Sequence, residues 1–206
     1  ADSVDMAILT LMKTAGCIYL GIGVESGSDR TLARIKKGYT REKAIKGVRL
    51  IRDSGIEVSI NIIIGFPFET PEDIRGSISL IKELDVPANI NTFTPYPKSE
   101  LYDECVRRGL VKHDIDWSSI SQHSPYNEFI QEISPVEYRK LLWEMVSVAD
   151  KIFNKINNRN KFHRIRRIHE IWHEEGRHPI KFFKVIADKI IVFLKQNFHK
   201  LRSDGK

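Results

Sequence analysis

The sequence predicts an α/β fold built from β/α units of the barrel type, with parallel strands, followed by an α-helical carboxyl-terminal region. β-Branched apolar residues dominate 56–64, which end in a Gly-Phe-Pro turn before a helix start at Thr70-Pro71. Such a run indicates a strand covered on both faces, as in a parallel sheet. Expected strands are about 30–40 residues apart with helices between them, the spacing of barrel-type units.

Each element is indicated by its own pattern. Serine or threonine stands at several expected helix starts, and glycine follows several expected helix ends, in agreement with capping preferences. Three strands cannot close a barrel, so the sheet is expected to be open or incomplete. The expected strands are 17–24, 56–64 and 89–93, and the expected helices are 3–15, 28–36, 40–54, 71–84 and 99–109.

The pattern divides the chain into three regions. Residues 1–112 carry the β/α units, and residues 113–133 lack periodicity, so a solvated connector is favoured there over a metal site. Residues 134–206 form a basic helical region that begins with the capping box Ser134–Glu137. Their apolar spacing predicts three helices, the first to about residue 156, the second ending at Gly176 and the third over about 182–194.

Composition indicates a globular cytoplasmic protein. The 206 residues are 41% hydrophobic and 29% charged, and no apolar run approaches the length of a membrane span. Two cysteines, Cys17 and Cys105, do not suggest a disulfide framework and fit a reducing compartment. The first residue is Ala, which favours a fragment or a processed product. The net charge of +6 comes from residues 151–206, which carry 15 Lys/Arg against 5 Asp/Glu.

Polar and backbone groups gather where the expected strands end. Glu25 follows the first strand, Asn61 and the Gly65-Phe66 turn belong to the second, and Thr94 follows the third. Carboxyl ends of parallel strands meet at one rim, where α/β folds bind ligands. A carboxylate there suits the hydroxyls of a ribose, and Lys37 is placed to meet a ligand carboxylate. Solvated surface charges and a satisfied core amide remain the alternative interpretation.

Four segments together resemble the radical S-adenosylmethionine (SAM) superfamily. They are Gly21–Asp29, Ile35–Gly38, Ile64–Thr70 and Thr94–Pro97. The likeness is to the carboxyl-terminal half of the partial, TIM-like (β/α)6 barrel, in the branch of cobalamin-dependent members and methylthiotransferases. It covers about residues 1–112.

The resemblance implies specific contacts with SAM. By it, Glu25 and Asn61 contact the ribose and Lys37 meets the methionine carboxylate. Relatives often have Arg in place of Lys37 and Asp in place of Asn61. The residues implied to shape the adenine pocket are Ile63, Gly65, Phe66 and Thr94.

The resemblance also implies a [4Fe–4S] cluster and an electron donor for the parent enzyme, and in some relatives cobalamin. The cluster would reduce SAM to a 5′-deoxyadenosyl radical. Its Cys-x3-Cys-x2-Cys motif is absent, and Cys17 and Cys105 cannot replace it because three thiolates must reach one cluster. The fragment alone is therefore expected to be inactive. The alternative function is a non-catalytic barrel module that serves as a binding scaffold.

The basic tail leaves three interpretations open. The first is a helical cap with solvated charges. The second is an RNA-facing surface carrying Arg164, Arg166 and Arg167. The third is a peripheral membrane helix over 180–202 with lysines around an apolar face. The substrate itself, whether a small molecule, RNA or lipid, does not follow from the sequence.

Overall fold

The computed structural model describes residues 5–111, 122, 127 and 129–175, with side chains described as far as residue 158. The chain divides into two units, residues 1–156 and 157–206. All three strands belong to the first unit. Among the described residues, no helix combines the length and the apolar composition needed to cross a membrane.

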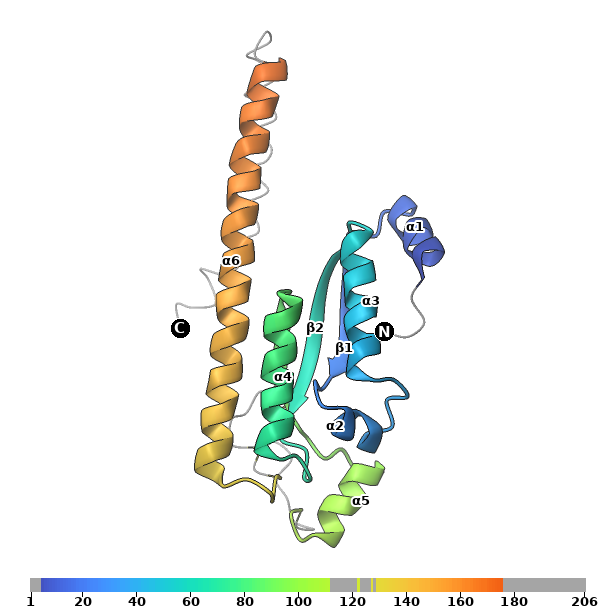
Figure 1. The fold of residues 1–206 in the computed structure, drawn as a ribbon, viewed down its shortest axis with the longest axis vertical. Helices are drawn as coiled ribbons and strands as arrows, with labels where there is room; N and C mark the ends of the chain where they lie inside the picture. Colours follow the sequence, from blue (N-terminus) through green and yellow to red (C-terminus); the bar gives the residue numbers. More distant parts are fainter. Residues whose placement is uncertain (1–4, 112–121, 123–126, 128, 176–206) are drawn as a thin grey trace. The chain divides into compact units, whose positions relative to one another are not determined.

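Strands and helices alternate through the first unit (Figure 1). The predicted α/β class with parallel strands and a helical carboxyl-terminal region is confirmed. The elements are α1 (Met6–Thr14), β1 (Tyr19–Glu25), α2 (Asp29–Arg34), α3 (Arg41–Asp53), β2 (Glu57–Ile64), α4 (Pro71–Leu84), β3 (Ala88–Thr92), α5 (Glu100–Arg107) and α6 (Pro135–Glu175).

The helix starts follow the predicted capping chemistry. Ser28, Thr40 and Ser99 each accept a hydrogen bond at the start of the following helix. Thr70 and Asp73 form a reciprocal capping box in front of α4, with Pro71 at the first helical position. These local signals explain why the bounds of α3 and α4 lie so close to those expected from sequence.

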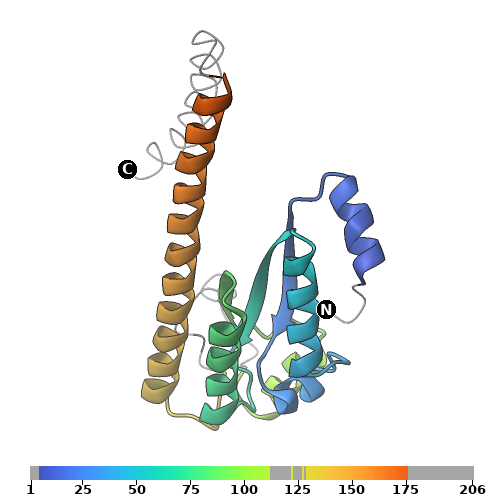
Figure 2. The same cartoon turned by 45° about the horizontal axis from the view of Figure 1, so that its top comes forward.

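The sheet has the order β1-β2-β3, and both strand pairs are parallel. Gly23 pairs with Asn61, and Asn61 pairs in turn with Asn89, so these three positions lie in one row across the sheet. The β1–β2 pairing shifts by one residue between Gly23 and Glu25. Figure 2 shows α3 and α4 along one face of the sheet.

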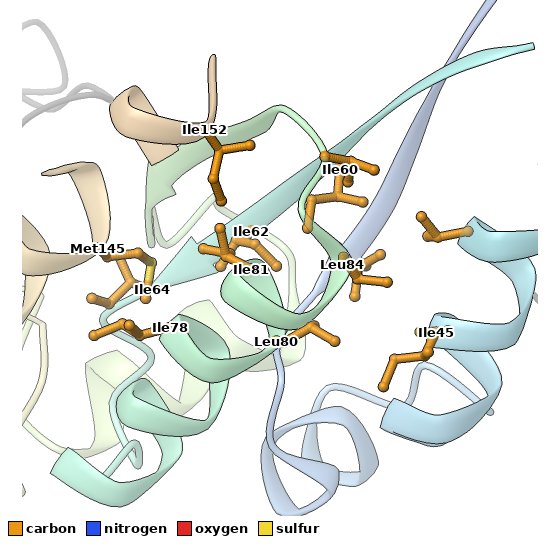
Figure 3. Close-up of a cluster of buried hydrophobic side chains, with 14 of the residues drawn as sticks. Ile45, Ile60, Ile62, Ile64, Ile78, Leu80, Ile81, Leu84, Met145 and Ile152 are labelled. Carbon is orange, nitrogen blue, oxygen red and sulfur yellow. The ribbon is translucent and has the colours of Figure 1, made fainter. Parts of the chain in front are cut away.

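One face of β2 forms the centre of the hydrophobic core. Ile60, Ile62 and Ile64 alternate along the strand and are at most 1% exposed. They pack against apolar side chains of α4 and α6 (Figure 3). The partners drawn there include Ile78, Leu80, Ile81, Leu84, Met145 and Ile152.

The opposite face of β2 is less covered than predicted. Asn61 and Ile63 are only half-buried, so the expectation of a strand buried on both faces is wrong for this side. The physical reason is that the described helices cover the face of Ile60, Ile62 and Ile64, whereas Asn61 and Ile63 line a cavity.

Two expectations for the carboxyl-terminal half are also wrong. The first two predicted tail helices are one helix, α6, because residues 157–161 contain neither Gly nor Pro to end it. Several residues expected in a solvated connector are buried, including Asn127, Phe129 and Ile130. The third predicted tail helix lies outside the described residues.

Candidate ligand-binding site

A cavity of about 680 Å³ opens at the carboxyl ends of the strands. This is the rim at which the sequence predicted a ligand. All three strands contribute to its wall, together with the segments that follow them. The lining includes Glu25, Asn61, Ile63, Phe66, Asn91 and Thr94.

Glu25 enters the cavity from the end of β1 in an unusual backbone conformation. Its φ of 67° lies in the left-handed region, which non-glycine residues rarely adopt. Its Oε1 lies 3.1 Å from Nζ of Lys37. A Cβ at Gly23 would overlap that same carboxylate oxygen, so the absence of a side chain at Gly23 leaves space for it. Tyr39 donates from its hydroxyl to the Gly23 carbonyl at 2.8 Å and holds the strand end.

Asn61 is fixed by an amide on the neighbouring strand. Asn89 donates from Nδ2 to Oδ1 of Asn61 at 3.0 Å. The Asn61 NH2 group therefore keeps its donor capacity for other partners. An amide in this state complements a ligand oxygen, such as that of a ribose hydroxyl.

The turn after β2 is held by a buried carboxyl group. Glu69 is 0% exposed, and its Oε2 accepts from the backbone N–H of Gly65 at 2.7 Å and of Phe66 at 3.1 Å. Burial raises the pKa of Glu69 to about 8, although these two hydrogen bonds act in the opposite direction. The turn thus depends on a buried carboxyl group whose pKa lies well above its ordinary value.

Gly65 itself faces Tyr138 and is not part of the cavity lining. Its φ is 94°, and a Cβ there would lie 2.7 Å from the Tyr138 hydroxyl oxygen. The role of Gly65 in this structure is to let the chain turn tightly, so that Phe66 comes to the cavity wall.

A second network joins the loop after β1 to the start of α4. Asp73 accepts from Ser28 Oγ at 2.5 Å and from the guanidinium of Arg30, and Arg30 also donates to the Phe68 carbonyl at 2.7 Å. Burial alone would raise the pKa of Asp73, but its hydrogen bonds from Arg30, Ser28 and Thr70 lower it to about 2. The loop after β1 is therefore tied to the start of α4 by a charged carboxylate.

Aromatic rings form another part of the wall. Phe66 and Phe93 both line the cavity, with ring centroids 5.1 Å apart. Phe129 packs edge-on against Phe93 at 6.1 Å from outside. Flat apolar surface of this kind suits an aromatic heterocycle.

The structure brings most of the sequence-predicted residues to one cavity. Glu25, Asn61, Ile63, Phe66 and Thr94 line it. Lys37 reaches it through its ion pair with Glu25, and Gly65 supports it from the turn as described above.

Sequence reasoning missed two residues that hold the cavity wall, Glu69 and Asn127. Glu69 lies inside the Ile64–Thr70 motif, four residues after Gly65 and three after Phe66. This short spacing is the signal that could have indicated a contact with their backbone amides. Asn127 contacts the end of β3 from more than 30 residues away in sequence, and no local pattern marks it.

Where the structure describes the chain, no group of three His, Cys, Asp or Glu side chains is arranged to hold a metal ion. Both cysteines are free thiols. Cys105 is fully buried, and burial raises its pKa to about 11, so it is a poor thiolate ligand.

A comparison with known families covers part of this rim. The sequence profile described as the radical SAM superfamily matches residues 2–81, which include Glu25, Lys37, Asn61 and Gly65. Over these residues the chain is similar to the radical SAM superfamily.

Relatives of the chain differ in the reactions that their names describe. A protein called an uncharacterized methyltransferase, from Pyrococcus horikoshii, is 36% identical over 115 residues, covering 55% of this chain and 25% of that protein. The tRNA-2-methylthio-N6-dimethylallyladenosine synthase of Thermotoga petrophila is 27% identical over 196 residues, covering 94% of this chain and 38% of that protein. The chain thus spans about a quarter to two fifths of the length of these relatives.

A solved structure shows the same fold. Coproporphyrinogen III oxidase of Escherichia coli, a radical SAM enzyme, aligns with a TM-score of 0.51 at 16% identity, over 73% of this chain and 30% of that one. At this identity the likeness concerns the fold alone.

Proposed function

We propose that this chain supplies the ribose, adenine and carboxylate contacts for SAM in a radical SAM enzyme. The observation that carries the proposal is the placement of Glu25. Its carboxylate lies beside Lys37 at a cavity whose wall also includes Phe66 and Phe93. SAM combines a ribose diol, an adenine ring and an amino-acid carboxylate. The rim offers Glu25 for the diol, Phe66 for the ring and Lys37 for the carboxylate.

The donor set fits the nucleoside part of SAM. The Glu25 carboxylate accepts hydrogen bonds from ribose hydroxyls, and the Asn61 amide donates to a ribose oxygen. Phe66 and Phe93 offer apolar faces for the adenine ring. The space over Gly23, which any side chain would reduce, is used by the Glu25 carboxylate. The Lys37 ammonium, released from Glu25 on binding, would pair with the methionine carboxylate.

The residues of this chain do not fit a [4Fe–4S] cluster. Its sequence has two cysteines, and the buried Cys105 lies among apolar side chains at the end of α5. No step of the reaction is therefore assigned to these residues, and their part in the enzyme is to bind and orient SAM.

Equilibrium binding of SAM to the protein at its natural length tests the proposal. Glu25→Gln removes the charge that accepts from the ribose hydroxyls and is expected to weaken SAM binding at least tenfold, equivalent to about 1.4 kcal/mol. Glu57→Gln, at an exposed position where β2 begins, is the matched control and should bind like the parent. Equal SAM affinity in the Glu25→Gln variant and the parent would refute the ribose role.

RNA is the substrate class that we propose for further testing. The reason is the name of the Thermotoga petrophila relative, a tRNA-modifying synthase, together with the basic composition of residues 151–206. Salt-sensitive RNA binding that is lost on replacing Arg164, Arg166 and Arg167 with Ala would support it. Liposome binding without RNA binding would favour the membrane interpretation, and neither would favour a helical cap.

A further inference from the structure

Helix α6 carries large apolar side chains on a second face, apart from the face that packs into the core. Met145 and Ile152 are buried and point toward the core in Figure 3. Val136, Trp143 and Phe153 are 73%, 58% and 52% exposed. With about 3.6 residues per turn, this exposed set lies about a third of a turn around the helix from the buried set. Apolar side chains aligned in this way on an exposed helix indicate a contact surface.

The side of α6 toward α4 already has its partners within the chain. Lys82 Nζ lies 3.8 Å from Glu144 Oε1, and Lys155 Nζ lies 2.6 Å from Asp85 Oδ2. These ion pairs flank the apolar contacts between α6 and the core. A partner on the second face of α6 would therefore not compete with them.

The second face has the residue spacing of a coiled-coil contact. Its positions follow one another at alternate steps of three and four residues, which keeps a row on one side of two helices that wrap around each other. At 1.5 Å per residue, this row is about 26 Å long. We call it the α6 seam, and its residues are Val136, Arg139, Trp143, Val146, Asp150 and Phe153.

The α6 seam is complementary to itself when a second copy runs in the opposite direction. In a two-fold symmetric contact, each pair of residues occurs twice with the two copies exchanged. Each apolar pair then joins a large side chain to a small one, and the charged pair joins opposite charges. The pairs across the two copies are Val136 with Phe153, Arg139 with Asp150, and Trp143 with Val146.

The two charged residues select this direction over the parallel one. In a parallel pair, Arg139 and Asp150 would each face the same residue of the other copy, and like charges in contact oppose association. Polar groups within a helix seam are known to fix register at some cost in affinity. The Arg139 guanidinium has five N–H donors, so it can bind a carboxylate of a second copy in addition to other partners.

We propose that the α6 seam binds the α6 seam of a second copy of this chain, forming an antiparallel dimer with two-fold symmetry. The inference does not depend on the proposed function, because none of the seam residues lines the cavity at the strand ends.

Sedimentation equilibrium over a range of concentrations tests the dimer, using the protein at its natural length and charge-reversal variants. Arg139→Asp and Asp150→Arg each bring like charges together twice, so each should weaken the dimer at least about a hundredfold. The double variant exchanges the two charges and should dimerise within about tenfold of the parent. Lys151→Asp reverses an exposed charge of α6 outside the seam and should dimerise like the parent.

Mixing the two single variants tests the charge pairing directly. The mixed dimer has opposite charges in both charged pairs, so the mixture should dimerise although neither variant does so alone. Circular dichroism and thermal unfolding show that each variant is folded, and the double variant provides the same test if one single variant is not.

Three results would overturn the proposal. A parent that stays monomeric would show that the seam does not bind a second copy, whether another segment of the chain or a different protein covers it. A dimer that persists in both single variants would lie on another surface. A folded double variant that stays monomeric would exclude the antiparallel pairing of Arg139 with Asp150.

Discussion

The Glu25 carboxylate and the Lys37 ammonium form an ion pair with Oε1 and Nζ 3.1 Å apart, beside the backbone of Gly23. The two groups that the resemblance assigns to different parts of one ligand therefore form an ion pair with each other. A zwitterionic ligand can replace both halves of the pair, since it offers its own hydroxyl donors to Glu25 and its own carboxylate to Lys37.

Gly23→Ala should weaken SAM binding without unfolding the protein. A Cβ at this position would overlap Glu25 Oε1, but that atom ends a flexible side chain and can move away at little cost. We expect at least a tenfold loss of affinity by calorimetry, with a change of less than about 1 kcal/mol in the free energy of unfolding.

Gly21→Ala is the matched control for this experiment. Gly21 lies two residues earlier on the same strand, and a Cβ there would meet its nearest neighbour at 3.7 Å, an ordinary contact. It should bind SAM like the parent. If both alanine variants lose SAM binding equally, the loss comes from a general disturbance of β1 and not from filling the space that the Glu25 carboxylate occupies.

Because of Glu69, the free energy of unfolding should fall as the pH rises from 5 to 8. Its folded-state pKa of about 8 lies above the ordinary value of 4.5, so the folded protein holds a proton that the unfolded chain releases. The stabilisation is fully present below pH 4.5 and is lost as the pH approaches 8, by up to about 1.4 kcal/mol per pH unit. Urea unfolding at a series of pH values measures this slope.

Glu69→Gln mimics the protonated side chain and should flatten that slope. The glutamine oxygen can still accept from the Gly65 and Phe66 amides. Glu72→Gln, an exposed glutamate in the first turn of α4, should keep the parent slope. A slope that is unchanged in the Glu69→Gln variant would show that Glu69 is ionised in the folded protein.

The parts of the fold that could be predicted are those set by residues close together in sequence. Thr70 and Pro71 mark the start of α4 because a capping box and a proline act within one turn. The continuity of α6 was missed because Asn, Arg and Lys at 157–161 lower helix propensity only slightly and do not end a helix.

In the site, too, local patterns predict only those residues whose position depends on the neighbouring sequence. Glu25 and Thr94 could be placed at the rim because Glu25 ends β1 and Thr94 lies two residues after the end of β3. The Glu25–Lys37 pair and the hydrogen bond from Asn127 to Thr94 depend on how distant segments pack. Contacts between residues that are far apart in sequence cannot be predicted from local patterns in a single sequence.

Asp73 should protect the fold against acid. Its pKa of about 2 lies below the ordinary 3.8, so the folded state favours the charged form, and this stabilisation is present above pH 3.8 and lost as the pH falls toward 2. Asp73→Asn should lower the free energy of unfolding at pH 6 by about 1–3 kcal/mol, since hydrogen bonds to a charged group are lost. Its stability should also change less between pH 4 and pH 2. Asp53→Asn, at the exposed end of α3, should behave like the parent.

Gly65→Ala should be more destabilising than Gly16→Ala, although both residues have nearly the same backbone conformation. Their φ angles are 94° and 93°, so each alanine carries a similar left-handed strain of about 1 kcal/mol. A Cβ at Gly16 would meet nothing within 4 Å, whereas one at Gly65 would lie 2.7 Å from the hydroxyl of the buried Tyr138. We expect the free energy of unfolding to fall by roughly 2–4 kcal/mol for Gly65→Ala and by about 1 kcal/mol for Gly16→Ala. Adding Tyr138→Phe to Gly65→Ala removes the overlapping hydroxyl, so the double variant should lose less stability than the sum of the two single changes. If the two changes in the free energy of unfolding simply add, the destabilisation by Gly65→Ala comes from the backbone strain of the turn and not from overlap with Tyr138 of α6.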